Sequence, residues 1–311
     1  MRRLWIDTDT ASDDAVAIMM ALRAPDVRVI GISVVAGNVP VDTGARNARY
    51  VVELCRSEVP VHLGAARPLL REPHFAYFFH GADGMSDRGY PEPQRPVADG
   101  HGVDALIRAV REAPREITLV TLGPLTNVAL ALKIAPDIAD KIAMCYVMGG
   151  AATCVGNITP AAEYNIWVDP EAARIVLHSR LKLLLVGWEN CRGEANLDDR
   201  DIEALRAMKS VYADFAIDCN ATAHRVNRDL MREPGMALPD PIAMAVALDP
   251  ALCTKQSAHF VDVETQGELT RGMTVVDAIG VLRRPENAEV CWQIDTKGWK
   301  RALFALLSDT A

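Results

Sequence analysis

Short runs rich in Val, Ile and Leu recur through the first two thirds of the chain, and each is followed by a segment with helical periodicity. Buried runs separated by helices are typical of βαβ units in a parallel sheet. The pattern therefore predicts an α/β fold with an open, mostly parallel, Rossmann-like sheet flanked by helices. The predicted strands span 4–9, 27–36, 59–63, 117–122, 142–148 and 181–186, and the predicted helices span 14–23, 41–56, 103–112, 125–134 and 170–178.

Two segments interrupt this alternation. Residues 64–102 are rich in Pro, Gly, His and aromatic side chains, and a long irregular stretch in a compact enzyme is usually functional, so we expect a loop or lid insertion there. Residues 198–231 predict a helical insertion with a charged face. No repeat or linker divides the chain, so we expect a single domain over 1–311. The remaining predicted elements are a helix at 241–248, strands at 260–264, 273–276 and 289–294, and a helix at 299–307.

The composition narrows the class of protein. Half of the 311 residues are hydrophobic and 24% are charged, which is enough apolar material for a large core. The net charge is −8 with no basic run, so neither nucleic acid nor a membrane is an expected partner. Acidic residues begin at Asp7, where a secretory signal would be apolar, and no run approaches the roughly 20 apolar residues of a membrane span. The seven scattered cysteines form no close pair, which favours a reducing cytoplasm.

The strongest chemical signal is an acidic turn at the end of the first predicted strand. Asp7, Asp9, Asp13 and Asp14 lie within eight residues, directly before an apolar helix. Clustered carboxylates repel one another unless a cation or shared protons hold them, and hard oxygen ligands favour Ca²⁺ or Mg²⁺. Hydrogen bonding at a strand end, or N-capping by Ser12 or Asp13, would explain one or two of these residues but not four.

Other polar groups follow the predicted strands. Asn38 ends the second run, at the same sheet edge as the acidic turn. The turn after the fourth predicted strand can aim the backbone carbonyl of Leu122 at a metal, although a tight turn capped by Thr126 is the simpler alternative. Asp240 precedes a buried helix, where it is either a cap or a carboxylate ligand from a distant part of the chain.

A block of amides and a carboxylate comes after the fifth predicted strand. Asn157, Glu163 and Asn165 can hydrogen-bond several hydroxyl groups, which suits a sugar. The alternative is a turn-rich loop that leads to Asp169 as the N-cap of the next helix, with Pro170 at its first position. For Asp169 we favour the capping role.

Together these motifs resemble the nucleoside hydrolase family, which includes the inosine–uridine-preferring enzymes. The resemblance covers essentially the whole chain, and the ordered set is far more specific than any one motif. The motifs are 7–14 (Asp-Thr-Asp-Thr-Ala-Ser-Asp-Asp), 37–38 (Gly-Asn), 46–48 (Arg-Asn-Ala), 80–84 (His-Gly-Ala-Asp-Gly), 123–127 (Gly-Pro-Leu-Thr-Asn), 157–165, 240–241 (Asp-Pro) and 270–272 (Thr-Arg-Gly).

The resemblance implies Ca²⁺-dependent hydrolysis of the N-glycosidic bond of ribonucleosides, which gives free base and ribose. It also implies the nucleoside hydrolase fold and a homodimer or homotetramer. In the implied site, one Ca²⁺ per subunit binds a water that Asp13 deprotonates. The implied metal ligands are Asp9, Asp14, the Leu122 carbonyl and Asp240. The implied ribose-binding residues are Asn38, Asn157, Glu163 and Asn165, together with Asp13 and Asp14.

One position departs from the family pattern. Many members carry His directly before the last metal-binding aspartate, and that His is thought to protonate the leaving base. This chain has Pro239, which transfers no proton. Either another group activates the base, or the substrate has a leaving group that needs less help. The candidates for the base pocket are His80, Trp188, Tyr212 and His224.

Three alternatives to an ordinary nucleoside hydrolase remain open. A haloacid-dehalogenase phosphatase shares the Asp-x-Asp at Asp7 and Asp9, but it expects Thr or Val where this chain has Ala11, and it lacks a following Asp-Asp pair. A non-catalytic nucleoside- or ribose-binding protein fits the missing His, although Asp13, which metal binding alone does not need, argues for catalysis. Hydrolysis of a modified nucleoside is the third.

Overall fold

Eight strands form one sheet in the order β3-β2-β1-β4-β5-β6-β10-β7, in a computed structural model that describes residues 1–309. Positions 310–311, the end of the predicted domain, lie outside the described residues. Every neighbouring pair is parallel except β10 and β7, which are antiparallel. The strands are β1 (Arg2–Thr8), β2 (Val27–Val34), β3 (Val61–Leu63), β4 (Ile117–Thr121), β5 (Met144–Met148), β6 (Leu183–Val186), β7 (Cys253–His259) and β10 (Ala288–Ile294).

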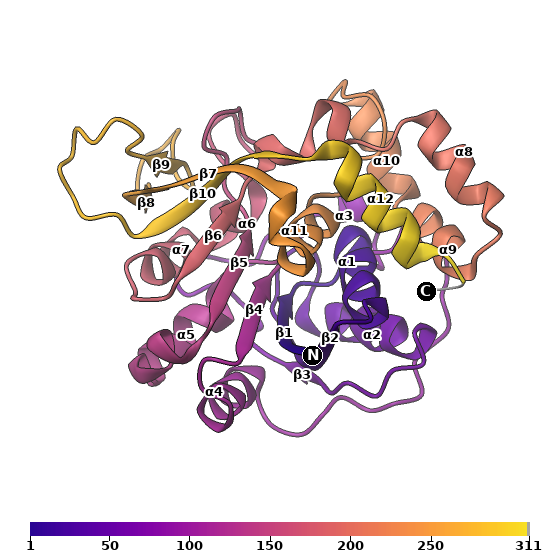
Figure 1. Cartoon of the computed structure of the whole chain (residues 1–311), viewed down its shortest axis with the longest axis horizontal. Helices are drawn as coiled ribbons and strands as arrows, with labels where there is room; N and C mark the ends of the chain where they lie inside the picture. The colour runs from indigo at the N-terminus through magenta and orange to yellow at the C-terminus, as the bar shows by residue number, and fades with distance from the viewer. Residues whose placement is uncertain (310–311) are drawn as a thin grey trace.

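Helices cover both faces of this sheet. Figure 1 shows α4, α5 and α7 on one side and α1, α2, α11 and α12 on the other. The bounds of the helices are α1 (Ser12–Arg23), α2 (Val41–Leu54), α3 (Tyr77–His80), α4 (Gly102–Glu112), α5 (Thr126–Ile134), α6 (Tyr164–Val168), α7 (Pro170–Leu177), α8 (Asp199–Ala207), α9 (Val211–Cys219), α10 (Ala221–Asp229), α11 (Pro239–Leu248) and α12 (Thr296–Leu307). Within this described part of the chain, no helix combines the length and apolar character that crossing a membrane requires.

The alternation of side chains in β1 divides the core into two layers. Leu4 and Ile6 pack with α1 and α11, whereas Trp5 points to the other face and packs with α4 and α5. A strand buried on both faces has no polar side, which explains the continuous apolar run at the start of the chain. The central strand is therefore fixed by two separate cores.

The order of the strands creates a site at the end of β1. The chain builds β1, β2 and β3 outward in one direction, and β4 then returns to the other side of β1. The loops after β1 and β4 therefore diverge, and ligands of open α/β sheets bind in the crevice at such a switch point. The acidic turn follows β1, and Leu122 follows β4.

The predicted α/β fold with a mostly parallel sheet is confirmed, and one strand was not predicted. The strand β7 carries polar residues at several positions, Thr254, Lys255 and Gln256 among them, because it lies at the edge of the sheet. The predicted strands at 260–264 and 273–276 correspond to β8 (Val261–Val263) and β9 (Thr274–Val276). These two pair with each other outside the main sheet.

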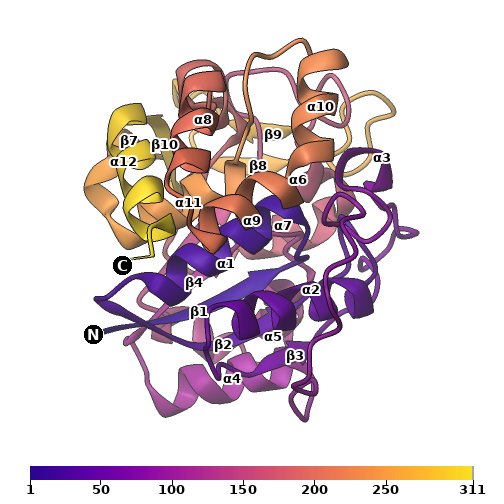
Figure 2. The same ribbon diagram turned by 90° about the vertical axis from the view of Figure 1, so that its right-hand side faces the viewer.

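The two predicted insertions have different structures. Residues 64–101 contain only the short helix α3, and their role as a lid stays a prediction. Residues 199–229 form the helices α8, α9 and α10, which confirms the helical character of this segment. Figure 2 shows these three helices gathered on one side of the molecule, away from α4 and α5.

Trp5 and Gly31 show how closely β1 and β2 are fitted. The two residues are partners across the pair, next to a register shift at Leu4/Trp5. The indole N–H of Trp5 donates to the hydroxyl of Ser33 over 2.9 Å, and a Cβ on Gly31 would lie 2.3 Å from the indole ring. Only glycine leaves room for the Trp5 ring at this point.

We therefore expect Gly31→Ala to lower the free energy of unfolding by about 1–3 kcal/mol, because the added methyl group displaces a packed indole. Urea denaturation of the wild type and the variant measures the loss. In a Trp5→Leu background the same substitution should cost much less, since the smaller side chain leaves space. An equal cost in both backgrounds would show that the Gly31 backbone, not the Trp5 ring, demands glycine.

Candidate active site

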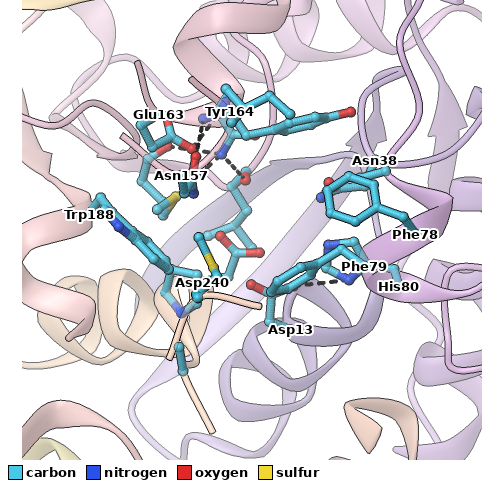
Figure 3. Close-up of a pocket in the computed structure, with 18 residues that line it drawn as sticks. Asp13, Asn38, Phe78, Phe79, His80, Asn157, Glu163, Tyr164, Trp188 and Asp240 are labelled. Carbon is cyan, nitrogen blue, oxygen red and sulfur yellow. Dashed lines mark hydrogen bonds and ion pairs between the residues drawn. The ribbon is translucent and has the colours of Figure 1, made fainter. Parts of the chain in front are cut away.

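A pocket opens beyond the carboxyl ends of β1, β4 and β5, and its walls differ in character. Figure 3 shows Trp188 on one side and Phe78 on the other, with Asp13 and Asp240 between them. The polar lining consists of Asp13, Asn38, Asn157, Glu163, Asn165 and Asp240. The apolar lining includes Phe78, Phe79, Trp188, Met231, Ala237 and Pro239. One pocket thus offers polar groups for hydroxyls and ring faces for a planar group.

Carboxylates from both ends of the chain meet at the floor of this pocket. One oxygen from each of Asp13, Asp14 and Asp240 lies within 4.8 Å of the other two. Asp14 is held by two donors, the Thr8 hydroxyl at 2.5 Å and the Ala11 N–H at 2.9 Å. The helix α11 delivers Asp240 in its first turn, and α1 delivers Asp13 and Asp14 in its own.

Asp9 lies against the same cluster and is held from one side only. Its Oδ2 accepts the Asn38 N–H at 2.5 Å, whereas its buried Oδ1 has no hydrogen-bond partner. A Cβ on Gly37 would lie 2.1 Å from Oδ2, so the backbone passes close to this carboxylate. The buried Oδ1 of Asp13 is likewise without a partner. Two buried, unpaired carboxylate oxygens are a costly arrangement that a bound cation would relieve.

Burial dominates the electrostatics of the cluster. Burial raises the pKa of Asp13 to about 7, with a further rise from the charge of Asp14. The pKa values of Asp9 and Asp240 are raised well above the usual range, first by burial and then by the neighbouring carboxylates. Burial also raises the pKa of Asp14. A divalent cation would lower all four values, because it favours the charged form of each group.

Asn165 connects the residue after β4 to the last residue of β5. Its Nδ2 donates to the Leu122 carbonyl at 2.8 Å and to the Met148 carbonyl at 3.3 Å. A carbonyl oxygen has two lone pairs, so Leu122 can accept this bond and still face a cation. The structure therefore brings the end of β4, the end of β5 and α6 to one point.

Glu163 caps the short helix α6 and faces the pocket. Its carboxylate accepts the N–H groups of Gly150 and Asn165 at 2.9 Å and of Ile166 at 3.2 Å. Burial raises its pKa to about 7, against the effect of these donors. Asn157 braces the same turn, because its Oδ1 accepts the Tyr164 N–H at 2.8 Å. These side chains are fixed before any ligand arrives.

His80, at the end of α3, lies beside the catalytic candidate Asp13. Its Nδ1 is 2.7 Å from the Ser12 hydroxyl and 3.9 Å from Oδ1 of Asp13. Burial lowers the pKa of the imidazole to about 3, so the ring is neutral at pH 7. A neutral imidazole held in this way can orient Asp13 or a substrate group.

Tyr212 and His224 were predicted to line the base pocket, and this prediction is wrong, because both lie outside the pocket lining. Tyr212, on α9, does not line the pocket, and its ring packs 3.6 Å from the guanidinium carbon of Arg23. His224, on α10, also lies outside the lining, among the charges of Asp199, Arg228 and Asp229. Both residues belong to the helical segment 199–229, and the sequence pattern did not show which faces of these helices are buried. His80 and Trp188 do line the pocket.

Comparison with known proteins is consistent with this geometry. Residues 4–301 match the family model described as inosine-uridine preferring nucleoside hydrolase. The chain belongs to this nucleoside hydrolase family. It is 38% identical over 302 residues to a pyrimidine-specific ribonucleoside hydrolase from Shewanella sp. (strain MR-7), covering 96% of this chain and 93% of that protein. Membership of this family confirms the expected hydrolase activity on the N-glycosidic bonds of ribonucleosides.

Solved structures agree with the sequence comparison. A plant nucleoside hydrolase superposes with a TM-score of 0.93 at 32% identity, covering 99% of both chains. A purine-preferring ribonucleoside hydrolase from Gardnerella vaginalis gives 0.89 at 30% identity, covering 98% of this chain and 99% of the other. The predicted nucleoside hydrolase fold is therefore confirmed.

Sequence reasoning missed several residues that line the pocket of this nucleoside hydrolase. Phe78 and Phe79 lay within the predicted loop insertion, and the density of aromatic residues there was the available signal. Met231 and Ala237 carried no such signal, because they reach the pocket from an irregular stretch before α11. Ser12, the partner of His80, was weighed only as a helix cap.

Asp7 supports the hydrolase site from behind the pocket. Its Oδ2 accepts the hydroxyl of Ser33 and, at 2.9 Å, the Nδ2 of Asn127, while its buried Oδ1 has no partner. Burial raises the pKa of Asp7 to about 7 from 3.8, against the effect of both hydrogen bonds. Trp5, Ser33, Asp7 and Asn127 thus form one network across β1, β2 and α5.

This shift predicts a pH-dependent cost of folding. The folded protein holds a proton on Asp7 from about pH 4 to pH 7, whereas the unfolded chain has lost it, so stability falls as pH rises through that window. Asp7→Asn removes the effect. The free energy of unfolding of Asp7→Asn relative to wild type should therefore rise with pH and level off above about pH 7, by up to about 4 kcal/mol for a shift of about three units.

Urea denaturation from about pH 4.5 to pH 8 in a metal chelator measures this difference. Asp42→Asn, at an exposed position in the first turn of α2, is the matched control and should show no comparable rise. A difference between Asp7→Asn and wild type that does not change with pH would contradict the prediction.

Proposed function

We propose that this nucleoside hydrolase depends on Ca²⁺ and that Asp13 takes the proton from the attacking water. The observation that carries the proposal is the meeting of Asp13, Asp14 and Asp240 within 4.8 Å, beside a buried Asp9 oxygen without a partner. Four buried carboxylates and a carbonyl are hard oxygen donors, which suit Ca²⁺ better than softer metals. The residues present therefore fit the ion.

Asp9, Asp14, Asp240 and the Leu122 carbonyl are the proposed ligands. Asp9 presents its free Oδ1, and Asp240 reaches the cluster from α11. Asp14 is oriented by Thr8 and Ala11, so its carboxylate does not have to be ordered on binding. Held by these residues, such an ion would orient the sugar hydroxyls and would lower the pKa of water.

Asp13 is the proposed general base. It lines the pocket, and its Oδ1 has no hydrogen-bond partner, so this oxygen is free to accept a proton from water. His80 flanks this oxygen at 3.9 Å and so limits how the carboxylate can turn. Departure of the nucleobase leaves positive charge on the sugar ring in an oxocarbenium-like state, and the surrounding carboxylates stabilise that charge.

Asn38, Asn157, Glu163 and Asn165 are the proposed partners of the ribose hydroxyls, with Asp13 and Asp14 beside the same ring. All four side chains line the pocket. Two of them are also hydrogen-bonded to the backbone, Asn157 through its Oδ1 and Asn165 through its Nδ2. The base then lies on the apolar side, against Trp188. A homodimer or homotetramer stays a prediction.

Release of ribose from a panel of nucleosides tests this proposal. We expect Asp13→Asn to lower the turnover number about 100-fold or more while substrate still binds, because general-base catalysis contributes that much. A chelator should abolish release, and added Ca²⁺ should restore it. Asp42→Asn, which removes an exposed carboxylate in the first turn of α2, outside the pocket lining, is the control and should match the wild type.

Two results would contradict the proposal. Wild-type protein that binds nucleosides without releasing ribose would favour the non-catalytic binding protein. Release that survives both the chelator and Asp13→Asn would show that neither the ion nor this carboxylate carries the reaction. Ribose release from modified nucleosides alone would support the proposed mechanism and would show that the substrate is a modified nucleoside.

A further inference from the structure

Among the described residues, the apolar lining of the pocket carries no titratable side chain that could protonate a leaving base. Pro239 is at the first position of α11, immediately before Asp240, and has no proton to transfer. Met231, Ala237, Phe78 and Phe79 complete this wall with carbon side chains and one thioether. Hydrolysis of a neutral nucleoside needs a proton on the departing base, because the base otherwise leaves as an anion.

Tyr164 and His80 also line the pocket, and each is hydrogen-bonded to a neighbouring group. The Tyr164 hydroxyl is hydrogen-bonded to the carbonyls of Gly37 at 2.8 Å and His74 at 2.6 Å. His80 bonds through Nδ1 to Ser12 and turns toward Asp13, on the sugar side. The proton of the Tyr164 hydroxyl is therefore committed to a backbone carbonyl, and His80 lies beside Asp13.

The same wall is well suited to a positive charge. Trp188 and Phe78 face the pocket from opposite sides, and aromatic faces attract a cation placed over them. Asp13, Asp240 and Glu163 line the pocket, and no Lys or Arg does so among the described residues. Attraction to the ring faces is stronger for a desolvated cation than for an exposed one.

Resting on the proposed function, we propose that this pocket is specific for ribonucleosides whose base carries a fixed positive charge, such as an N-ribosyl pyridinium or an N7-alkylated purine ribonucleoside. The glycosidic C–N bond breaks and its electron pair neutralises the base, which leaves as a neutral molecule without a proton. Water forms the new C–O bond at the sugar, and its proton goes to Asp13. The products are ribose, neutral base and one proton, so atoms and charge balance.

Matched substrate pairs that differ in charge test the inference. N-ribosylnicotinamide and its 1,4-dihydro form share a ring size, but only the first is cationic, and 7-methylguanosine and guanosine form a second pair. Cationic bases also leave faster in water, so binding is measured separately in Asp13→Asn. We expect the cationic member of each pair to bind at least about tenfold more tightly and to have the higher kcat/KM in the wild type.

Two variants separate the causes. Trp188→Leu keeps an apolar side chain but removes the ring face, so it should weaken binding of the cationic member more than that of the neutral one. Pro239→His places a titratable group beside the base, so it should raise kcat/KM for guanosine and uridine at least about tenfold more than for N-ribosylnicotinamide. An equal effect of either variant on both members of a pair would contradict the role assigned to that residue.

The outcomes also distinguish this inference from the proposed function. A wild type that binds and hydrolyses uridine or guanosine better than both cationic substrates would overturn the inference and leave the Asp13 mechanism intact. No ribose release from any substrate, with Ca²⁺ present, would overturn the proposed function and the inference together. Preference for only one cationic substrate would support the inference and identify which ring system the wall accepts.

Discussion

The burial of like charges at the end of β1 is the constraint on which this structure depends. Asp9, Asp13, Asp14 and Asp240 are all buried, and burial raises the pKa of each; the charges of neighbouring carboxylates raise the pKa values of Asp9, Asp13 and Asp240 further. The surrounding donors satisfy only some of their oxygens. Burying several carboxylates together lowers the stability of the fold when nothing neutralises them. Such a cost is typical of functional sites, where a bound cation or a reaction requires the charged groups.

The sheet provides the rigidity that this cluster needs. Parallel pairing of β1 with β2 and β4 fixes the ends of three strands at one edge, and the switch in strand order separates the loops above them. The network of Trp5, Ser33, Asp7 and Asn127 ties β1 to β2 and α5 just below the site. Carboxylates on so constrained a turn cannot move apart to relieve their repulsion.

Sequence patterns predicted the parts of this protein whose structure depends on residues close together in the sequence. The apolar runs of β1, β2 and β4 and the acidic turn are local, so their place at one sheet edge followed from the chain order alone. The edge strand β7 was missed because partly exposed residues such as Lys255 conceal its periodicity. Tyr212 and His224 were misplaced because the faces of α9 and α10 depend on packing against α1 and α3, which no local pattern contains.

The dispersal of the cluster along the chain has a consequence for biosynthesis. Asp9, Asp13 and Asp14 leave the ribosome before most of the sheet has been made, whereas Asp240 and the wall formed by Met231, Ala237 and Pro239 emerge only after it. A nascent chain therefore carries three crowded carboxylates with an unfinished pocket for most of its synthesis. Prematurely terminated products that lack α11 would retain the acidic turn but neither the fourth carboxylate nor the complete cavity, so translation errors of this kind would not yield partly active enzyme.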